Sequence, residues 1–124
     1  MPADLAKALD CYSKAAELGE ALAQSKLGDI YLYGTGVKVN YKTAEKWYQA
    51  AAEQGDMSAQ YNLGLMYAYG MGVGHDFQVG YMWLKLATAK GSNDAADALK
   101  AIQSSVSAEE VAGALKMIKE KGYK

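Results

Sequence analysis

Only a few side chains of this chain have the chemistry that a catalytic or metal-binding site needs, and their spacing does not assemble one. His75 is the only histidine and follows a glycine, which predicts a solvated loop position rather than a general base. Cys11 is the only cysteine, which excludes intrachain disulfides and multi-cysteine metal sites, and we expect it to be a small core residue. Asp94 and Asp97 lie one helical turn apart without a partner histidine, which predicts an exposed helix face. The sequence therefore predicts no catalytic residue, no cofactor and no metal site.

Two glycine-rich segments have the look of phosphate-binding loops. Gly34-x-Gly36 and Gly70-x-Gly72-x-Gly74 lack both the preceding strand and the Lys-Ser/Thr pair that would contact a nucleotide. Glycine is also the residue that most readily takes the left-handed conformation at the end of a helix. We expect these glycines to end helices and to form the loops that follow.

The charge balance and the hydropathy pattern exclude several classes of partner. Thirteen basic and fourteen acidic side chains give a net charge of −1, whereas nucleic acids and anionic membranes select clustered positive charge. No apolar run approaches the roughly 18 residues of a membrane span. The first residues lack the basic start and the apolar core of a signal peptide. We expect no nucleic-acid partner and no membrane insertion.

The elements that position these residues follow a repeat of 36 residues. The same residue returns at this interval in several columns: Gly19, Gly55 and Gly91; Ala15, Ala51 and Ala87; Ala23, Ala59 and Ala95. Repeats of roughly 20–50 residues are typical of solenoids, in which each unit buries its apolar face by stacking on its neighbours. We expect one domain over residues 1–124, composed of a half unit (4–19), two full units (20–55 and 56–91), and a degenerate unit with a capping helix (92–122).

Each full unit is predicted to be a pair of α-helices. The first helices run from Leu22 to Tyr33 and from Ser58 to Tyr69. A glycine inside a helix costs about 1 kcal/mol relative to alanine, so the glycines at positions 28 and 64 indicate a close approach of the partner helix.

The second helix of the middle unit has one apolar face, formed by Ala44, Trp47, Tyr48, Ala51 and Ala52. The same face returns one period earlier and one period later. Second helices are expected to begin near the N-cap residues Asp4, Asn40 and Asp76 and to end at glycines 19, 55 and 91. The pattern places Trp47 in the core, where Trp47→Ala would cost about 3–5 kcal/mol.

This combination resembles the Sel-one-like repeat (SLR) family, relatives of the tetratricopeptide repeats. Residues 23–55 and 59–91 each follow the family pattern A-x-x-x-L-G-x-x-Y-x-x-G-x-G-V, with alanines and a tryptophan before the final glycine. Asn40 stands where the family usually has an aspartate, and Gly80 where it usually has an alanine. The resemblance implies an all-α, right-handed superhelix of antiparallel helix pairs. The predicted half unit, two full units and degenerate unit with its capping helix give about seven helices. It also implies an adaptor that holds other proteins together.

Both ends depart from the repeat. Cys11 occupies the position filled by Trp47 and Trp83, which suits a helix with nothing stacked outside it. Lys100 and Gln103 replace the glycine and tyrosine of the third first helix. Residues 107–110 (Ser-Ala-Glu-Glu) predict a capping box for a last helix that ends at Gly122, with an apolar face of Val111, Ala114, Leu115 and Ile118.

The ten tyrosines fall into two groups. Several occupy core positions of the repeat, where packing with the hydroxyl at an edge is expected. Tyr33, Tyr61 and Tyr69 lie off the core face of the first helices, which line the concave groove of the related tetratricopeptide scaffolds. The candidate partner-binding residues are Asp29, Leu32, Tyr33, Tyr61, Leu65 and Tyr69. Additional packing between neighbouring first helices is the alternative interpretation.

We therefore expect a non-catalytic protein–protein interaction scaffold or adaptor that binds a peptide or partner protein in the concave groove. One alternative is a structural unit that forms homo-oligomers by stacking through its open N-terminal helix. A remote alternative is a small cell-wall hydrolase, for which the sequence offers no nucleophile–base pair. The sequence does not identify the compartment; the expectation is a soluble bacterial protein of the periplasm or cytoplasm.

Overall fold

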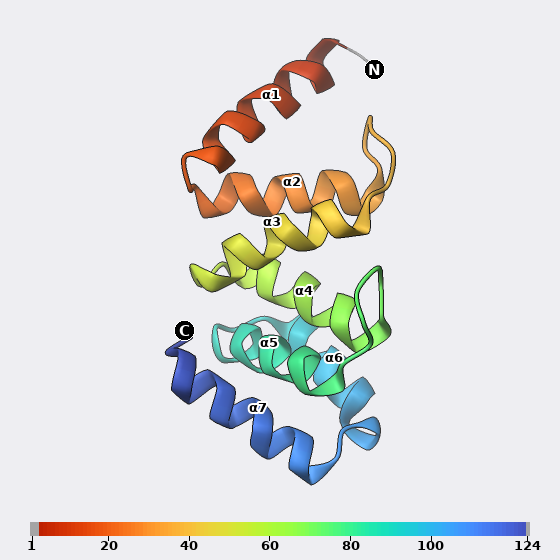
Figure 1. Ribbon diagram of the computed structural model, residues 1–124, viewed down its shortest axis with the longest axis vertical. Helices are drawn as coiled ribbons and strands as arrows, with labels where there is room; N and C mark the ends of the chain where they lie inside the picture. Colours follow the sequence, from red (N-terminus) through yellow and green to blue (C-terminus); the bar gives the residue numbers. More distant parts are fainter. Residues whose placement is uncertain (1–2, 124) are drawn as a thin grey trace.

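The computed structural model describes residues 3–123, and every regular element in this range is a helix. The elements are α1 (Ala3–Glu17), α2 (Ala21–Tyr33), α3 (Tyr41–Glu53), α4 (Met57–Tyr69), α5 (Phe77–Ala89), α6 (Asn93–Ile102), the 3-10 helix η1 (Gln103–Ser105) and α7 (Ala108–Lys121). Figure 1 shows them as one stack that runs from α1 at one end to α7 at the other. The prediction of an all-α solenoid with about seven helices is confirmed.

Consecutive helices pack on one another along the stack, from α1 on α2 through to α5 on α6. The two most extensive contacts are those of α2 with α3 and of α4 with α5, the helix pairs of the two full units. The first helices also contact one another directly, α2 with α4 and α4 with α6. The first helices therefore lie next to one another along one side of the stack.

Most helix ends are capped as the sequence predicts. The side chains of Asn40 and Asp76 accept hydrogen bonds from the backbone N–H groups of Thr43 and Val79, at 3.0 and 3.1 Å. Gly34 and Gly70 end α2 and α4 in the left-handed conformation, with φ of 69° and 66°. Helix α1 begins at Ala3, within one residue of the start predicted near Asp4.

The glycines inside the first helices permit close contact with the second helices. A Cβ atom on Gly28 would lie 2.5 Å from the Tyr48 ring, and one on Gly64 would lie 2.7 Å from Cγ of Leu84. Real Cβ atoms essentially never approach other heavy atoms so closely. The predicted close approach of the helix pairs is confirmed at both positions.

A ladder of polar side chains, absent from the sequence-based predictions, also repeats every 36 residues. Buried Gln24 donates to the backbone carbonyl of Ala16, and Gln60 donates in the same way to Ala52, both at 3.1 Å. The side-chain oxygen of Gln24 accepts from Gln54 at 2.8 Å, and that of Gln60 accepts from the Lys90 ammonium at 3.2 Å. Burial of Lys90 lowers the pKa of its ammonium. These bonds join each first helix to the second helices before and after it.

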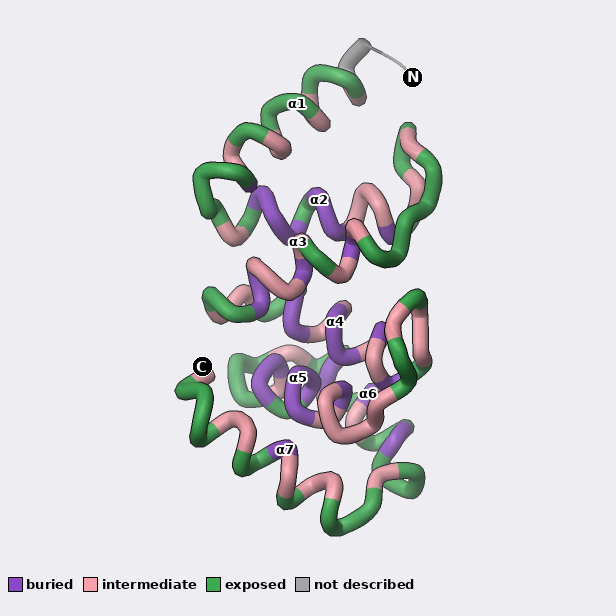
Figure 2. Tube along the Cα trace, in the orientation of Figure 1, coloured by how far each residue is buried: buried purple, intermediate pink, exposed green. Residues whose placement is uncertain are grey.

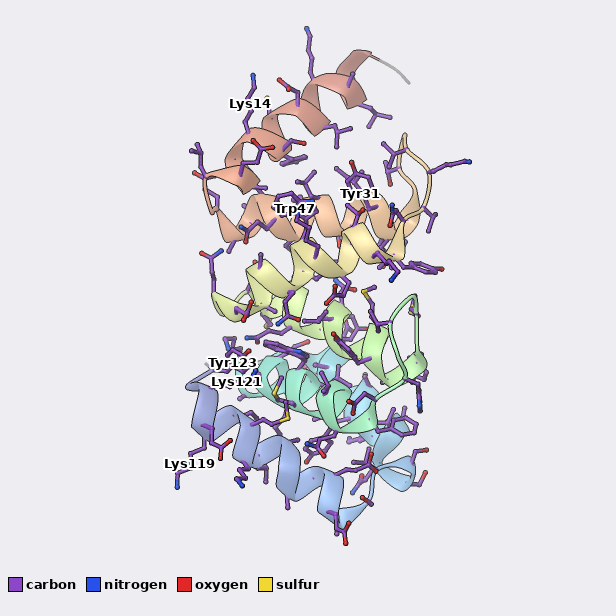
Figure 3. All side chains as sticks on the ribbon, viewed as in Figure 1. Lys14, Tyr31, Trp47, Lys119, Lys121 and Tyr123 are labelled. Carbon is purple, nitrogen blue, oxygen red and sulfur yellow. The ribbon has the colours of Figure 1, made fainter. Side chains whose placement is uncertain are left out.

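The core is thickest in the middle of the stack and thins toward α1, as the burial map in Figure 2 shows. Trp83 is 1% exposed, and its ring lies 4.8 Å from that of Tyr123. Trp47, labelled in Figure 3, is only half-buried, and the Lys46 ammonium lies over its ring. The expectation of a buried Trp47 is therefore only partly met. Cys11 is exposed, so its prediction as a small core residue is wrong: no described helix packs outside α1.

The last helix begins with the predicted capping box, in which Ser107 and Glu110 each bond to the other's backbone N–H. Gly122 ends it in the left-handed conformation, with φ of 66°. α7 packs on α5 rather than on α6. Ala114 and Ile118 pack on the core as predicted, whereas the prediction for Leu115 is wrong: it is 46% exposed, and Met117 packs on the core cluster.

Candidate functional site

The first helices present two tyrosines at equivalent positions, one on each full unit. Tyr33 is the last residue of α2 and Tyr69 the last residue of α4, each followed directly by a left-handed glycine. Because the helix ends there, the side chain of its last residue has no following turn to cover it. Tyr33 is 67% and Tyr69 56% exposed, which leaves two large, rigid apolar surfaces free for contact.

Tyr61 and Leu65 continue this surface along α4. They lie one helical turn apart, and both are half-buried against the core cluster that includes Ala68, Leu84 and Ala95. Each therefore has one side anchored in the core and one side in solvent. We call Tyr33, Tyr61, Leu65 and Tyr69 the tyrosine strip.

Two aspartates of α6 lie beside the strip. Burial raises the pKa of Tyr61, and the negative charge of Asp94 and Asp97 raises it further, together with the neighbouring hydroxyls of Tyr33 and Tyr69. These groups belong to α2, α4 and α6, and α4 contacts both of the other two helices. Asp94 and Asp97 are exposed, as the sequence predicts. The strip therefore combines aromatic surface with negative charge.

The position of Asp97 carries a signal that the sequence-based site prediction did not use. Asp97 lies 36 residues after Tyr61, so the two residues occupy the same position of successive first helices. Since α4 and α6 contact each other, equivalent positions face the same side of the stack. The 36-residue spacing therefore predicts that Asp97 and Tyr61 lie at neighbouring positions of adjacent first helices.

The two other predicted site residues lie in different surroundings. The carboxylate of Asp29 accepts a hydrogen bond of 2.5 Å from the hydroxyl of buried Tyr48. Burial raises the pKa of Tyr48, and the hydrogen bond to Asp29 and its charge raise it further. Leu32 is 9% exposed and packs in the central core cluster. Asp29 thus has a partner within the fold, and Leu32 has little surface to offer a ligand.

The one histidine of the chain lies in a loop and not on a helix of this strip. His75 is exposed in the loop between α4 and α5, with the edge of its ring against Phe77 at a centroid distance of 4.2 Å. Within the part of the chain that the structure describes, no three His, Cys, Asp or Glu side chains are grouped as metal ligands. No described helix is long and apolar enough to cross a membrane.

Comparison with known proteins identifies the repeat. The Sel1 repeat pattern matches residues 1–20, 21–56 and 58–92. No curated protein matches the chain at a significant level.

Two solved structures share the fold. The first is a protective antigen present in uropathogenic Escherichia coli strains and displays an SLR fold; it is 32% identical over 91% of this chain, with a TM-score of 0.85. The second is a Sel1 repeat protein from Oxalobacter formigenes, 38% identical over 73% of this chain, with a TM-score of 0.72. This chain spans 24% and 26% of the lengths of those two proteins.

Proposed function

The chain belongs to the Sel1 repeat family, and from this premise we propose that it is a non-catalytic adaptor that binds a protein segment along the tyrosine strip. Proteins of this family are generally protein–protein interaction scaffolds. The observation that carries the proposal is the exposure of Tyr33 and Tyr69 at equivalent positions of adjacent first helices. Tyrosine is enriched at binding hot spots because it buries a large area and loses little side-chain entropy.

The partner that suits this surface is an extended segment with apolar and basic side chains. Tyr61 and Leu65 are held by the core on one side, so they offer a preformed apolar floor. Asp94 and Asp97 add two carboxylates beside that floor. Arginine in particular stacks on aromatic rings and pairs with carboxylates. Asp29, one of the predicted partner-binding residues, already accepts a hydrogen bond from Tyr48, so we assign recognition of a cationic side chain mainly to the α6 aspartates.

The experiment is a selection of peptides from a displayed random library on the immobilised protein, followed by affinity measurements. Tyr33→Ala/Tyr69→Ala is the main test variant, because both side chains are exposed and their loss should leave the helices intact. Leu115→Ala removes a similarly exposed apolar side chain from α7, far along the chain, and is the matched control.

We expect the double variant to weaken binding of the selected peptides at least tenfold, since two hot-spot side chains are each worth about 1–2 kcal/mol or more. Leu115→Ala should leave binding unchanged. Adding Tyr61→Ala should abolish binding, provided that circular dichroism shows the helices intact. The double variant Asp94→Asn/Asp97→Asn should bind the basic peptides more weakly than the parent does, and this binding should depend less on salt concentration. Equal affinity of the parent and of a fully helical double variant would refute the proposal.

The self-assembly alternative gives a different result in the same set of proteins. Cys11 is exposed on α1, so a charged substitution there leaves the fold intact and tests whether α1 stacks on a second copy. A mass that rises with protein concentration, and that Cys11→Asp returns to the monomer value, would favour assembly over the adaptor function.

A further inference from the structure

The repeat is interrupted at α6 in a way that leaves a cavity. In the full units, Leu27 and Leu63 lie 36 residues apart and are completely buried beneath the second helices. Leu99 is the next residue in this series and is only half-buried. A cavity of about 450 Å³ lies around it, lined by Tyr81, Thr88, Ala96, Leu99, Lys100, Gln103, Val106 and Val111.

The cavity exists because α7 does not take the place of a second helix. Helices α3 and α5 pack against α2 and α4, whereas α7 packs on α5, where Gly113 meets the side chain of Gln78. In α2 and α4 the close approach depends on Gly28 and Gly64, and Lys100 occupies that position in α6. A lysine there excludes the tight helix–helix contact of the full units. The cavity is thus suited to a slimmer occupant than a helix.

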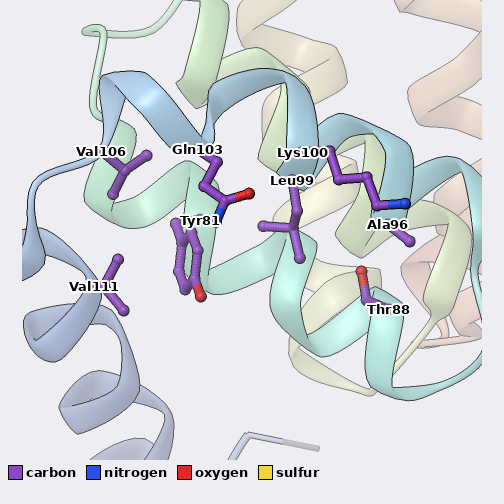
Figure 4. Close-up of a pocket in the computed structure, with 8 residues that line it drawn as sticks. All are labelled: Tyr81, Thr88, Ala96, Leu99, Lys100, Gln103, Val106 and Val111. Atoms are coloured by element: carbon purple, nitrogen blue, oxygen red, sulfur yellow. The ribbon is translucent and has the colours of Figure 1, made fainter.

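The walls and the charge of the cavity define the occupant. Figure 4 shows Val106 and Val111 at one end, Tyr81 and Leu99 in the middle, and Lys100 with Thr88 and Ala96 at the other end. The hydroxyl proton of Thr88 is donated to the Leu84 carbonyl at 2.8 Å, so Thr88 does not supply a free donor. Among the described residues, Lys100 forms no ion pair. One end of the cavity is therefore apolar, and the other holds the Lys100 ammonium, which is not taken up by a described ion pair.

We infer that this cavity binds a small aliphatic carboxylate, with the alkyl chain against Leu99, Val106 and Val111 and the carboxylate at the Lys100 ammonium. Burial of methylene groups supplies the affinity, and the ammonium sets the sign of the charge that is preferred. This site is separate from the tyrosine strip, and neither depends on the other.

The test measures binding of sodium decanoate, below its micelle concentration, by NMR titration of the isotope-labelled protein and by calorimetry. Decyltrimethylammonium is the probe of equal chain length and opposite charge. We expect decanoate to shift the amide signals around Leu99, Val106 and Val111, and shortening the chain to octanoate to weaken binding about threefold or more per methylene.

The charge of Lys100 is tested with Lys100→Gln and Lys100→Glu, both on an exposed side chain. We expect Lys100→Gln to weaken the binding of decanoate about threefold, which is the usual effect of losing one exposed ion pair. Lys100→Glu should make the protein bind decyltrimethylammonium more tightly than decanoate. Lys119→Gln removes the same charge from the solvent face of α7 (Figure 3) and should change neither affinity. Decanoate affinity that is unchanged in both Lys100 variants, or amide shifts that lie away from the cavity, would overturn the inference.

Discussion

The two tryptophans of the repeat provide a direct test of how far the burial of a side chain determines its contribution to the stability of this solenoid. Trp47 and Trp83 occupy the same position of successive second helices, 36 residues apart. Trp83 is 1% exposed, whereas Trp47 is only half-buried. The same substitution to alanine therefore removes similar atoms from two different environments.

The structure gives different costs for the two changes. Removing a fully buried tryptophan costs about 3–5 kcal/mol, and the Tyr123 ring beside Trp83 favours the upper part of that range. Trp47 loses only part of such a burial, together with a cation–π contact to Lys46 that is worth about 0.5–1 kcal/mol at an exposed site. We expect Trp83→Ala to cost about 4 kcal/mol and Trp47→Ala about 2 kcal/mol. The 3–5 kcal/mol expected for Trp47 from the sequence is thus an overestimate, because nothing in the repeat reveals how well each unit is covered.

The assays are thermal unfolding and urea unfolding, both followed by far-UV circular dichroism, since each substitution removes one of the two fluorescent tryptophans. Melting temperatures should fall by about 15 °C for Trp83→Ala and about 8 °C for Trp47→Ala, at roughly 4 °C per kcal/mol for a domain of this size. The slope of free energy against urea should stay constant, so that the change in midpoint reports stability. The control repeats both tryptophan substitutions in a Tyr123→Ala background. Without the Tyr123 ring, the free energies lost by Trp83→Ala and by Trp47→Ala should differ less. Equal losses for the two tryptophan variants, or a larger loss at Trp47, would refute the reasoning from burial.

Two further predictions concern contacts between the helix pairs. Gly28→Ala should destabilise the protein by about 1–3 kcal/mol, because its Cβ would lie 2.5 Å from the Tyr48 ring. Gly74→Ala, which meets open space, should change stability by less than about 0.5 kcal/mol, and urea unfolding of both variants checks the difference. Burial and Asp29 raise the pKa of Tyr48, so the folded protein keeps this proton where the unfolded chain loses it. The resulting stability is present below about pH 10 and is lost as the pH rises further; Tyr48→Phe should flatten this loss in urea midpoints measured from about pH 8 to pH 11. An alkaline loss that is the same in parent and variant would assign it to other tyrosines.

The fold was predictable because the information that specifies it is local and repeated. Glycine spacing gives the helix ends, and the alanine and aromatic columns give the packed faces, so positions such as Gly34, Asn40 and Gly64 have the roles that the sequence predicts. The errors lie where the partner is absent from the repeat. Cys11 and Leu115 are exposed because burial depends on what packs outside α1 and α7, which the period does not encode.

The candidate site was less predictable, because it depends on distances between side chains of different helices. Tyr33 and Tyr69 are exposed residues off the core face, as the helical period places them. Leu32 lies in the core because α3 and α4 close over that end of α2, a contact that the period of α2 alone does not show. The hydrogen bond from Tyr48 to Asp29 joins residues 19 apart in the sequence. Asp97, which contributes to the raised pKa of Tyr61, belongs to α6, whereas Tyr61 belongs to α4. Such pairs follow from the stacking geometry and not from any local pattern.

In the third unit, two positions that hold the full units together carry different residues, and the regular stacking of helix pairs stops there. Gln24 and Gln60 tie the first helices α2 and α4 to their neighbours, and the equivalent residue of α6 is Ala96, which has no side chain for that bond. Lys100 fills the position where Gly28 and Gly64 admit a second helix. These two changes remove the polar bond and the close contact of a full unit from the same face of α6. That face therefore lacks a tightly packed helix, and Ala96, Leu99 and Lys100 line a cavity instead. The departures from the repeat are local, and each replaces a stacking contact with accessible surface.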